Sequence, residues 1–278
     1  MDWLQWLELG VASAAAAAVG SMLGLGGGVF LVPIFTLFFG ISTKTAIAAS
    51  AVAVVTTSVV GSQTHLRNGF ANLRLAMMLQ VTTAIGALVG AFVGVLAPEQ
   101  ALRIVFGAVL MYAAVSMLRR RTASHDTSQE PDPQGLKATY TDGSNEVTYV
   151  PTSVPTGLGI SGTAGILSGM LGVGGGVIQV PAMNLFMKVP LKAAAGTSAL
   201  MAGITSVAGA FVHYSDGNVD PTLVAPAMIG IFAGGKLGAT FTKRLKVANL
   251  MAIFVVVLAF LGVSMFLTGV GIDVPWQR

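Results

Sequence analysis

The stretch MLGLGGGVFLVP at residues 22–33 returns as MLGVGGGVIQVP at residues 170–181. The second copy starts 148 residues after the first (170 − 22 = 148), and the same offset pairs residues far outside the motif. The matched pairs include Pro33 with Pro181, Lys44 with Lys192, Ser50 with Ser198, Thr57 with Thr205, His65 with His213, and Gly86 with Gly234. The chain is therefore one duplicated unit, over about residues 22–118 and 170–266. A duplicated apolar unit with glycine-broken segments at matching positions is typical of membrane transport sites.

The composition indicates that lipid surrounds most of the chain. Of its 278 residues, 54% are hydrophobic and only 9% are charged, whereas soluble domains are about 25% charged. The chain has no cysteine and three histidines, which excludes disulfides and leaves little material for a metal site. We therefore expect no cofactor and no metal. The net charge of +4 comes from basic residues that flank apolar segments, so it indicates membrane boundaries rather than nucleic-acid binding.

Apolar segments divide the chain into full and half-length spans. A spanning helix needs about 20 apolar residues, and six segments meet this length: 45–65, 73–96, 102–118, 192–213, 221–241 and 248–269. Two further segments each run into a glycine loop and continue as a short apolar stretch, 3–23 with 29–40 and 153–171 with 177–187. Each of these pairs is predicted to form a hairpin. The sequence leaves open whether the hairpins turn inside the membrane or cross it fully.

The expected fold class is an all-α integral membrane protein of two inverted repeats, each a glycine-broken hairpin plus three transmembrane helices. The first membrane repeat is expected at 1–120, a polar linker at 121–152, and the second membrane repeat at 153–278. Two β-prone runs in the linker flank Asp142-Gly143-Ser144-Asn145, a turn sequence that predicts a small β-hairpin.

Positive charge gives the orientation, because short cytoplasmic loops collect Lys and Arg. Arg119, Arg120, Arg121 and Lys137 mark the linker as cytoplasmic. Three full spans and one hairpin carry each repeat across the membrane an odd number of times, which predicts the inversion. Lys44 and Arg103 are exceptions, because this orientation places them outside.

The two glycine loops are the first candidate site. Non-helical backbone at membrane depth is tolerated only where it is buried in protein or lines a cavity. A helix that begins just after such a loop directs unpaired N–H groups and a positive dipole end back toward it, which favours an anion. The alternative is that the glycines only allow close helix packing. The candidate residues are Gly24, Gly26, Gly27, Gly28 and Val29 in the first loop, and Gly172, Gly174, Gly175, Gly176 and Val177 in the second.

Polar residues on the following helices form a second set of candidates. Ser50 and Thr57, with their counterparts Ser198 and Thr205, lie seven residues apart on one helical face. They either meet a ligand or bond to carbonyls of their own helix. Gln63 and Gln179 lack polar counterparts across the repeat and are weaker candidates.

Three cationic or titratable residues are candidates for charge coupling. His65 and His213 end their helices at matched positions, and they are either proton-linked groups or residues of the membrane interface. Lys236 lies inside a span opposite Leu88 of the first repeat. An intramembrane charge indicates function, unless its long stem carries the amine to the membrane surface.

Several absences narrow the function. No Asp or Glu lies deep in a span, Glu8 being the nearest case, which favours an anion over a cation or proton as the transported species. No nucleotide-binding loop is present, so we expect transport to be driven by gradients or by another subunit. The expected partners are a small anion and the bilayer, and the oligomeric state is left open, with a homodimer among the options. An anion channel is the main alternative. A membrane enzyme or a receptor that transports nothing is disfavoured by the lack of a buried acid/base pair.

The duplicated LG(L/V)GGGV motif with its following proline, the serine that begins the next helix, and the polar linker together resemble the TauE/SafE family of sulfite exporters. The resemblance covers the chain apart from the linker. It implies export of sulfite, or of an organosulfonate such as sulfoacetate, across the bacterial cytoplasmic membrane. It also implies that the matched loop residues contact the substrate.

Overall fold

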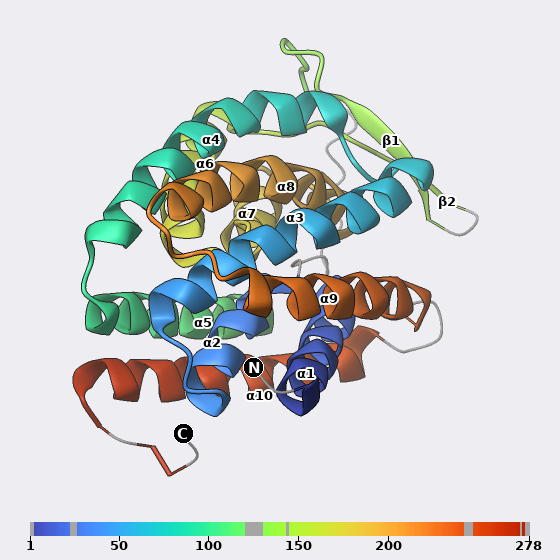
Figure 1. Cartoon of the computed structure of the whole chain (residues 1–278). Helices are drawn as coiled ribbons and strands as arrows, with labels where there is room; N and C mark the ends of the chain where they lie inside the picture. The colour runs from blue at the N-terminus through green and yellow to red at the C-terminus, as the bar shows by residue number, and fades with distance from the viewer. Residues whose placement is uncertain are drawn as a thin grey trace.

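Helices make up most of the chain (Figure 1). The computed structural model describes residues 3–22, 27–119, 130–142, 145–241, 247–272 and 274–275. Within these ranges lie ten helices and one two-stranded sheet. The long helices are α3 (Thr43–Arg67), α4 (Leu73–Leu96), α5 (Glu99–Arg119), α8 (Leu191–Ser215), α9 (Pro221–Phe241) and α10 (Val247–Val270). They confirm the six segments expected from hydropathy, with bounds that differ by a few residues.

The two expected hairpins are also present. In the first, α1 (Trp3–Met22) is followed by the short α2 (Gly28–Phe38), and in the second, α6 (Val154–Leu171) is followed by α7 (Gly176–Leu185). Five of the described helices are long and apolar enough to span a membrane, namely α3, α4, α5, α6 and α8. The fold is therefore the expected all-α membrane architecture.

Each repeat packs its fourth helix on the first helix of the other repeat. Gly86 of α4 leaves no room for a side chain, because its Cβ position touches the carbonyl of Gly162 on α6. Gly234 of α9 touches the carbonyl of Ala14 on α1 in the same way. The two contacts correspond across the repeat, because Gly234 is the counterpart of Gly86 and Ala14 is the counterpart of Gly162, each at the offset of 148 residues. Close backbone approach at small residues is the usual form of helix packing in membranes.

Matched helices of the two repeats run antiparallel where they meet. On α3 and α8, Gly61 approaches Ala199 whereas Ser58 approaches Gly203, so residue numbers rise along one helix as they fall along the other. The helices α5 and α10 follow the same order, with Gly107 beside Phe266 and Gly269 beside Ile104. Antiparallel packing of matched helices is the arrangement that inverted repeats require. The inversion itself stays a prediction.

The linker carries the expected β-hairpin, of strands β1 (Ala138–Asp142) and β2 (Asn145–Tyr149). The strands are antiparallel, with Tyr140 opposite Val147. Of the expected turn, Gly143 and Ser144 lie outside the described residues.

The hairpin is docked on the turn between α3 and α4. The ring centroid of Tyr140 lies 5.5 Å from that of Phe70, and Tyr149 packs on Tyr140 at 6.3 Å. The Asn72 side chain accepts a hydrogen bond from the N–H of Leu75, which caps α4, and its Nδ2 donates to the Leu136 carbonyl at 2.8 Å. Beyond the hairpin, the N–H of Thr152 donates to the Met187 carbonyl at 3.0 Å. The linker is therefore tied to both repeats.

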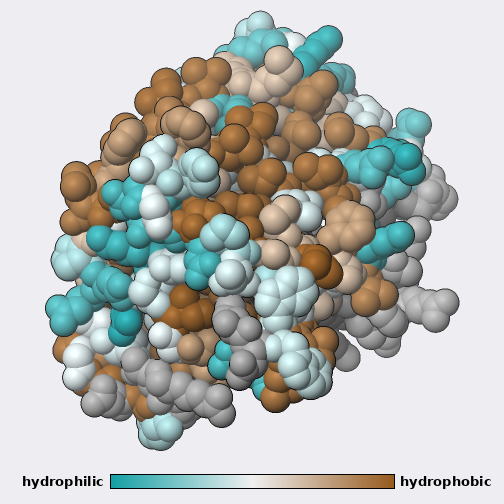
Figure 2. All heavy atoms as spheres, viewed as in Figure 1, coloured by the Kyte–Doolittle hydropathy of each residue, from teal (hydrophilic) through white to brown (hydrophobic). Residues whose placement is uncertain are grey.

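The surface is arranged as expected for a protein in lipid. Hydrophobic residues cover the middle of the face in Figure 2, and hydrophilic residues gather at the left and at the upper right. In Figure 1 these two places hold the α4–α5 turn and the β-hairpin. On α4, the apolar side chains of Met77, Val81, Ile85 and Phe92 are each at least 60% exposed. They form an outward face that lipid would cover.

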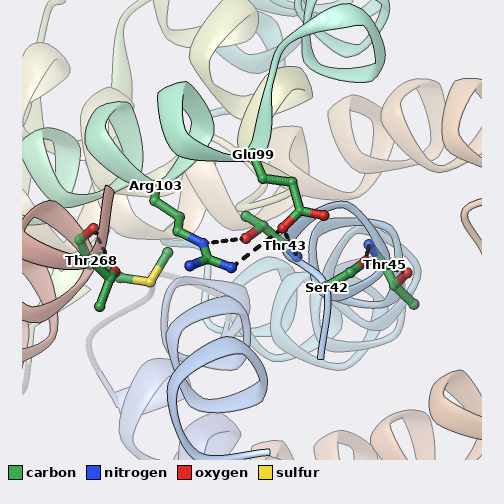
Figure 3. Close-up of polar contacts among 7 residues, drawn as sticks. Ser42, Thr43, Thr45, Glu99, Arg103 and Thr268 are labelled. Carbon is green, nitrogen blue, oxygen red and sulfur yellow. Dashed lines mark hydrogen bonds and ion pairs between the residues drawn. The ribbon is translucent and has the colours of Figure 1, made fainter. Parts of the chain in front are cut away.

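The two exceptions to the charge rule, Lys44 and Arg103, have structural partners, and Figure 3 shows those of Arg103. Lys44 Nζ donates to the Val95 carbonyl near the end of α4. Arg103 Nε donates to Thr43 Oγ1 at 2.8 Å, and its Nη2 lies 3.4 Å from a Glu99 carboxylate oxygen. Because these cations hold the start of α3 to α4 and α5, their position reflects helix packing as well as membrane orientation.

Candidate functional site

The second glycine loop ends one helix and begins another inside the protein. Gly172, Gly174 and Gly175 have φ angles of 66°, 75° and 78°, which favour glycine because a Cβ is strained there. All residues from Gly172 to Val177 are buried. No side chain caps α7, and within the described residues the N–H groups of Gly176 and Val177 donate no hydrogen bond. This loop therefore presents a buried, uncapped helix N-terminus.

The first loop has the same form where it is described. Gly27 has a φ of 29° and α2 begins at Gly28, again without a side-chain cap. Gly27 packs against Ala17 of α1, and both Gly28 and Val29 are buried. Gly24 and Gly26 lie outside the described residues.

The two loops meet beside α3. Ser50 Oγ lies 2.8 Å from the Gly172 carbonyl and 3.1 Å from the Gly28 carbonyl, so one hydroxyl bridges both loops. One turn further along α3, the Cγ1 methyl of Val54 lies 2.6 Å from the Cβ position of Gly174, and its other methyl touches that of Gly28. Two loops that are 148 residues apart in sequence therefore form one centre.

Buried polar atoms without partners surround the second loop. Ser206 Oγ lies 3.2 Å from the Cβ position of Gly174, and the Gln179 carboxamide carbon lies 3.4 Å from that of Gly175. Ser168 lies against Gly175 from the α6 side. Within the described part of the chain, Ser168 Oγ, Ser206 Oγ and Gln179 Oε1 have no hydrogen-bond partner. Each unpaired buried polar atom costs about 1–3 kcal/mol, so a polar ligand that paired with this cluster would remove that cost.

Two glutamines connect this cluster to α4. Gln179 Nε2 donates to Thr83 Oγ1, and Gln80 Nε2 donates to Thr205 Oγ1, both at 3.2 Å. Apolar residues stand at the matching positions of the other repeat, namely Met228 for Gln80, Ile231 for Thr83 and Leu31 for Gln179. The second loop is therefore the more polar of the two. From the sequence, Gln179 is only a weak candidate, and Gln80 and Thr83 are missed. All three are polar where the other repeat is apolar, and this difference between the repeats is the signal that could have identified them.

The predicted hydroxyl residues have different surroundings. Thr57 Oγ1 donates to the Val54 carbonyl of its own helix, and Thr205 Oγ1 donates to that of Met201. Ser198, the counterpart of Ser50, is fully buried, and its hydroxyl has no partner among the described residues.

The titratable candidates are not gathered at the loops. His65 is half-buried at the end of α3 beside Phe70, and His213 is fully buried near the end of α8. Because α3 and α8 pack antiparallel, the two histidines lie at opposite ends of the pair. Lys236 is exposed on α9 between exposed Phe232 and Leu237, so the structure places it on the outward face.

Neutral groups supply the polarity of this centre: backbone N–H groups, hydroxyls and carboxamides. Within the part of the chain that the structure describes, no three His, Cys, Asp or Glu residues are grouped to hold a metal ion. The arrangement is suited to binding an anion by hydrogen bonds and by the positive ends of helix dipoles.

Comparison with known proteins agrees with this architecture. A family model described as sulfite exporter TauE/SafE matches residues 9–265. The chain is 25% identical to "Probable membrane transporter protein YunE" of Bacillus subtilis (strain 168), over 96% of this chain and 99% of that relative. It is 26% identical to "Probable membrane transporter protein YdhB" of the same strain, over 84% and 89% of the two chains. It is 28% identical to "Probable membrane transporter protein MamO" of Magnetospirillum gryphiswaldense, over 94% of this chain and 45% of that relative. No solved structure matches significantly.

Proposed function

The chain belongs to the TauE/SafE family of multi-pass membrane transporters, and from this premise we propose that it exports a small sulfur oxyanion, sulfite or an organosulfonate such as sulfoacetate. The proposed location is the bacterial cytoplasmic membrane, and the proposed activity is secondary transport without an enzymatic step. The membrane potential favours this direction, because moving one negative charge out of a negative cytoplasm gains about 2.3 kcal/mol per 100 mV.

The observation that carries the proposal is the buried, uncapped start of α7. Among the described residues, its N–H groups at Gly176 and Val177 donate no hydrogen bond, and the nearby hydroxyls of Ser168 and Ser206 have no partner. Anions bind at such helix N-termini. Ser50 holds the first loop against the second. The proposed site is therefore the joint centre of both loops, with the candidate glycines as its backbone donors.

We also propose that the repeats are inverted, with domain limits at residues 120 and 153. The support is the antiparallel packing of α3 with α8 and the paired contacts of Gly86 and Gly234. Inverted repeats commonly form a transport site at their interface and move against one another to open it to either side.

The experiment is flux of labelled sulfite in proteoliposomes that contain the purified protein. Unlabelled sulfite, sulfoacetate, taurine, thiosulfate and sulfate are then compared as competitors. Counterflow distinguishes a carrier from the alternative of an anion channel, because a channel shows no stimulation by substrate on the opposite side. Failure to move any of these anions would refute the proposed function.

A matched pair of variants on α8 tests the place of the site. Ala202→Val adds bulk beside Gly174, from which the Ala202 Cβ is 3.2 Å away, and Val54 shows that the counterpart position accepts valine. Ala210→Val makes the same change on the outer groove between α8, α3 and α9. We expect loss of flux in the first variant only. Equal flux in both would place the substrate path elsewhere.

A further inference from the structure

We propose that the second loop selects an oxyanion that carries its own hydrogen-bond donor, and that Gln179 accepts the hydrogen bond from this donor. The inference rests on the proposed function and narrows its ligand: monoprotonated sulfite carries a donor, whereas sulfoacetate, a dianion at neutral pH, carries none. Two ligands share this chemistry: a monoprotonated oxyanion with an O–H group, and an aminosulfonate with an N–H group.

The orientation of the Gln179 carboxamide follows from its neighbour. Thr83 Oγ1 donates its only proton to the Leu79 carbonyl at 2.8 Å, so toward Gln179 it acts only as an acceptor. The carboxamide therefore turns its Nε2 to Thr83 and leaves Oε1 as an acceptor. This oxygen is buried in a residue that is 1% exposed, and it has no partner among the described residues.

In the proposed site, several donors and one fixed acceptor meet the same ligand. The N–H groups of α7 and the hydroxyls of Ser168 and Ser206 suit anionic oxygens, whereas Gln179 Oε1 repels an anionic oxygen and accepts only from an O–H or N–H group. A ligand without a donor leaves this oxygen unpaired and desolvated. Such a ligand is an alkylsulfonate without an amine, or the sulfate dianion.

The first loop lacks this acceptor. Leu31 stands at the position that matches Gln179, and Ile231 at the position that matches Thr83. The two loops therefore do not recognise the ligand equally, and the choice between anions falls to the second repeat.

The test is competition against labelled sulfite flux in proteoliposomes at pH 6 and pH 8. The competitors are methanesulfonate and sulfate, which lack a donor at these pH values, and aminomethanesulfonate, which has an N–H donor. Sulfite serves as the ligand with an O–H donor, because it gains a proton near neutral pH. We expect aminomethanesulfonate, and sulfite at pH 6, to bind about 10-fold more tightly than methanesulfonate, since one unpaired acceptor costs about 1–3 kcal/mol and 1.4 kcal/mol is tenfold. Equal competition by methanesulfonate would overturn the inference.

Two variants probe the acceptor directly. Gln179→Leu introduces the residue of the first repeat and should abolish the preference while some flux remains. Thr83→Val removes the group that fixes the carboxamide, so the amide can turn its N–H to the ligand, and competition by methanesulfonate should rise. Gln63→Leu, at an exposed position of α3, is the control and should keep the wild-type ranking. A ranking that Gln179→Leu and Thr83→Val both leave unchanged would refute the role of Gln179.

Anion-dependent thermal stabilisation of the purified protein in detergent gives a readout that needs no transport. The wild-type protein is compared with the same three competitors and sulfite. Stabilisation by the donor-bearing anions alone supports the inference even if no flux is seen, in which case only the proposed function fails. Equal stabilisation by all four anions overturns the inference while sulfite flux can still support the proposed function.

Discussion

Replacing Gly174 with alanine tests whether the second loop is held against α3 as closely as the structure shows. The φ of Gly174 is +75°, and a Cβ there would lie 2.6 Å from the Val54 Cγ1 methyl. Gly217, in the turn after α8, also has a φ of +75° but has nothing within 4 Å of its Cβ position. Gly217→Ala is therefore a control with the same backbone strain and no contact.

The expected magnitudes separate the two effects. A left-handed alanine costs about 1–2 kcal/mol, so Gly217→Ala should lower the free energy of unfolding by that amount. In Gly174→Ala, overpacking adds about 1–3 kcal/mol, for a loss of about 2–5 kcal/mol in all. Adding Val54→Ala removes the methyl that the new Cβ meets, so the double variant should recover much of the overpacking cost.

Equilibrium unfolding in mixed detergent micelles measures these differences, and sulfite flux measured on the same samples shows their effect on transport. We expect Gly217→Ala to transport as the wild type and Gly174→Ala to lose most of its flux. If the two alanine variants lose the same stability, or if Val54→Ala shows no coupling with Gly174→Ala, the packing of the second loop on α3 is wrong.

Further predictions concern the bridge, the hairpin and the outward lysine. Ser50→Ala removes the hydroxyl that joins the two loops and should lower the free energy of unfolding by about 1–3 kcal/mol. Its counterpart Ser198→Ala removes a hydroxyl without a partner among the described residues. This second variant should be neutral or stabilising in the same assay. Burial raises the pKa of Tyr149 from its ordinary 10.0 to about 12. Between these two pH values the folded state holds the phenol proton more tightly than the unfolded state does. The contribution of Tyr149 to stability is therefore complete below pH 10 and is lost as the pH rises from 10 toward 12. Phenolate absorbance should show one tyrosine that ionises late, and Tyr149→Phe should remove that step. Lys236→Leu, which introduces the residue of the first repeat, should leave sulfite flux unchanged because the side chain faces outward, and a large loss of flux would contradict this placement.

The sequence predicts the helices well because its signals are local. Hydropathy locates the six long helices to within a few residues, the glycine motif locates both helix breaks, and the Asp142–Asn145 turn locates the hairpin. Each of these depends on neighbouring residues only.

Which residues meet at the site depends on contacts between distant segments, so local sequence patterns could not predict it. The sequence left Ser50 either to meet a ligand or to bond to a carbonyl of its own helix, whereas in the structure its hydroxyl donates to the Gly172 carbonyl, 122 residues away. The bond between Gln179 and Thr83 spans 96 residues. The direction of Lys236 depends on the rotation of α9 about its axis, which a uniformly apolar span does not reveal.

If the repeats move against one another as proposed, the docked β-hairpin would make the free energy of opening unequal on the two sides of the protein. The duplicated unit occurs twice, but the linker segment 136–152 occurs once, between the copies. It binds the α3–α4 turn through Leu136 and the segment after α7 through Thr152. Separating the repeats on that side would have to break these hydrogen bonds and part the edge-to-face rings of Phe70 and Tyr140. Under the proposed mechanism the linker would therefore favour one of the two states of the transporter, and its sequence would set the balance between them without contact with the ligand.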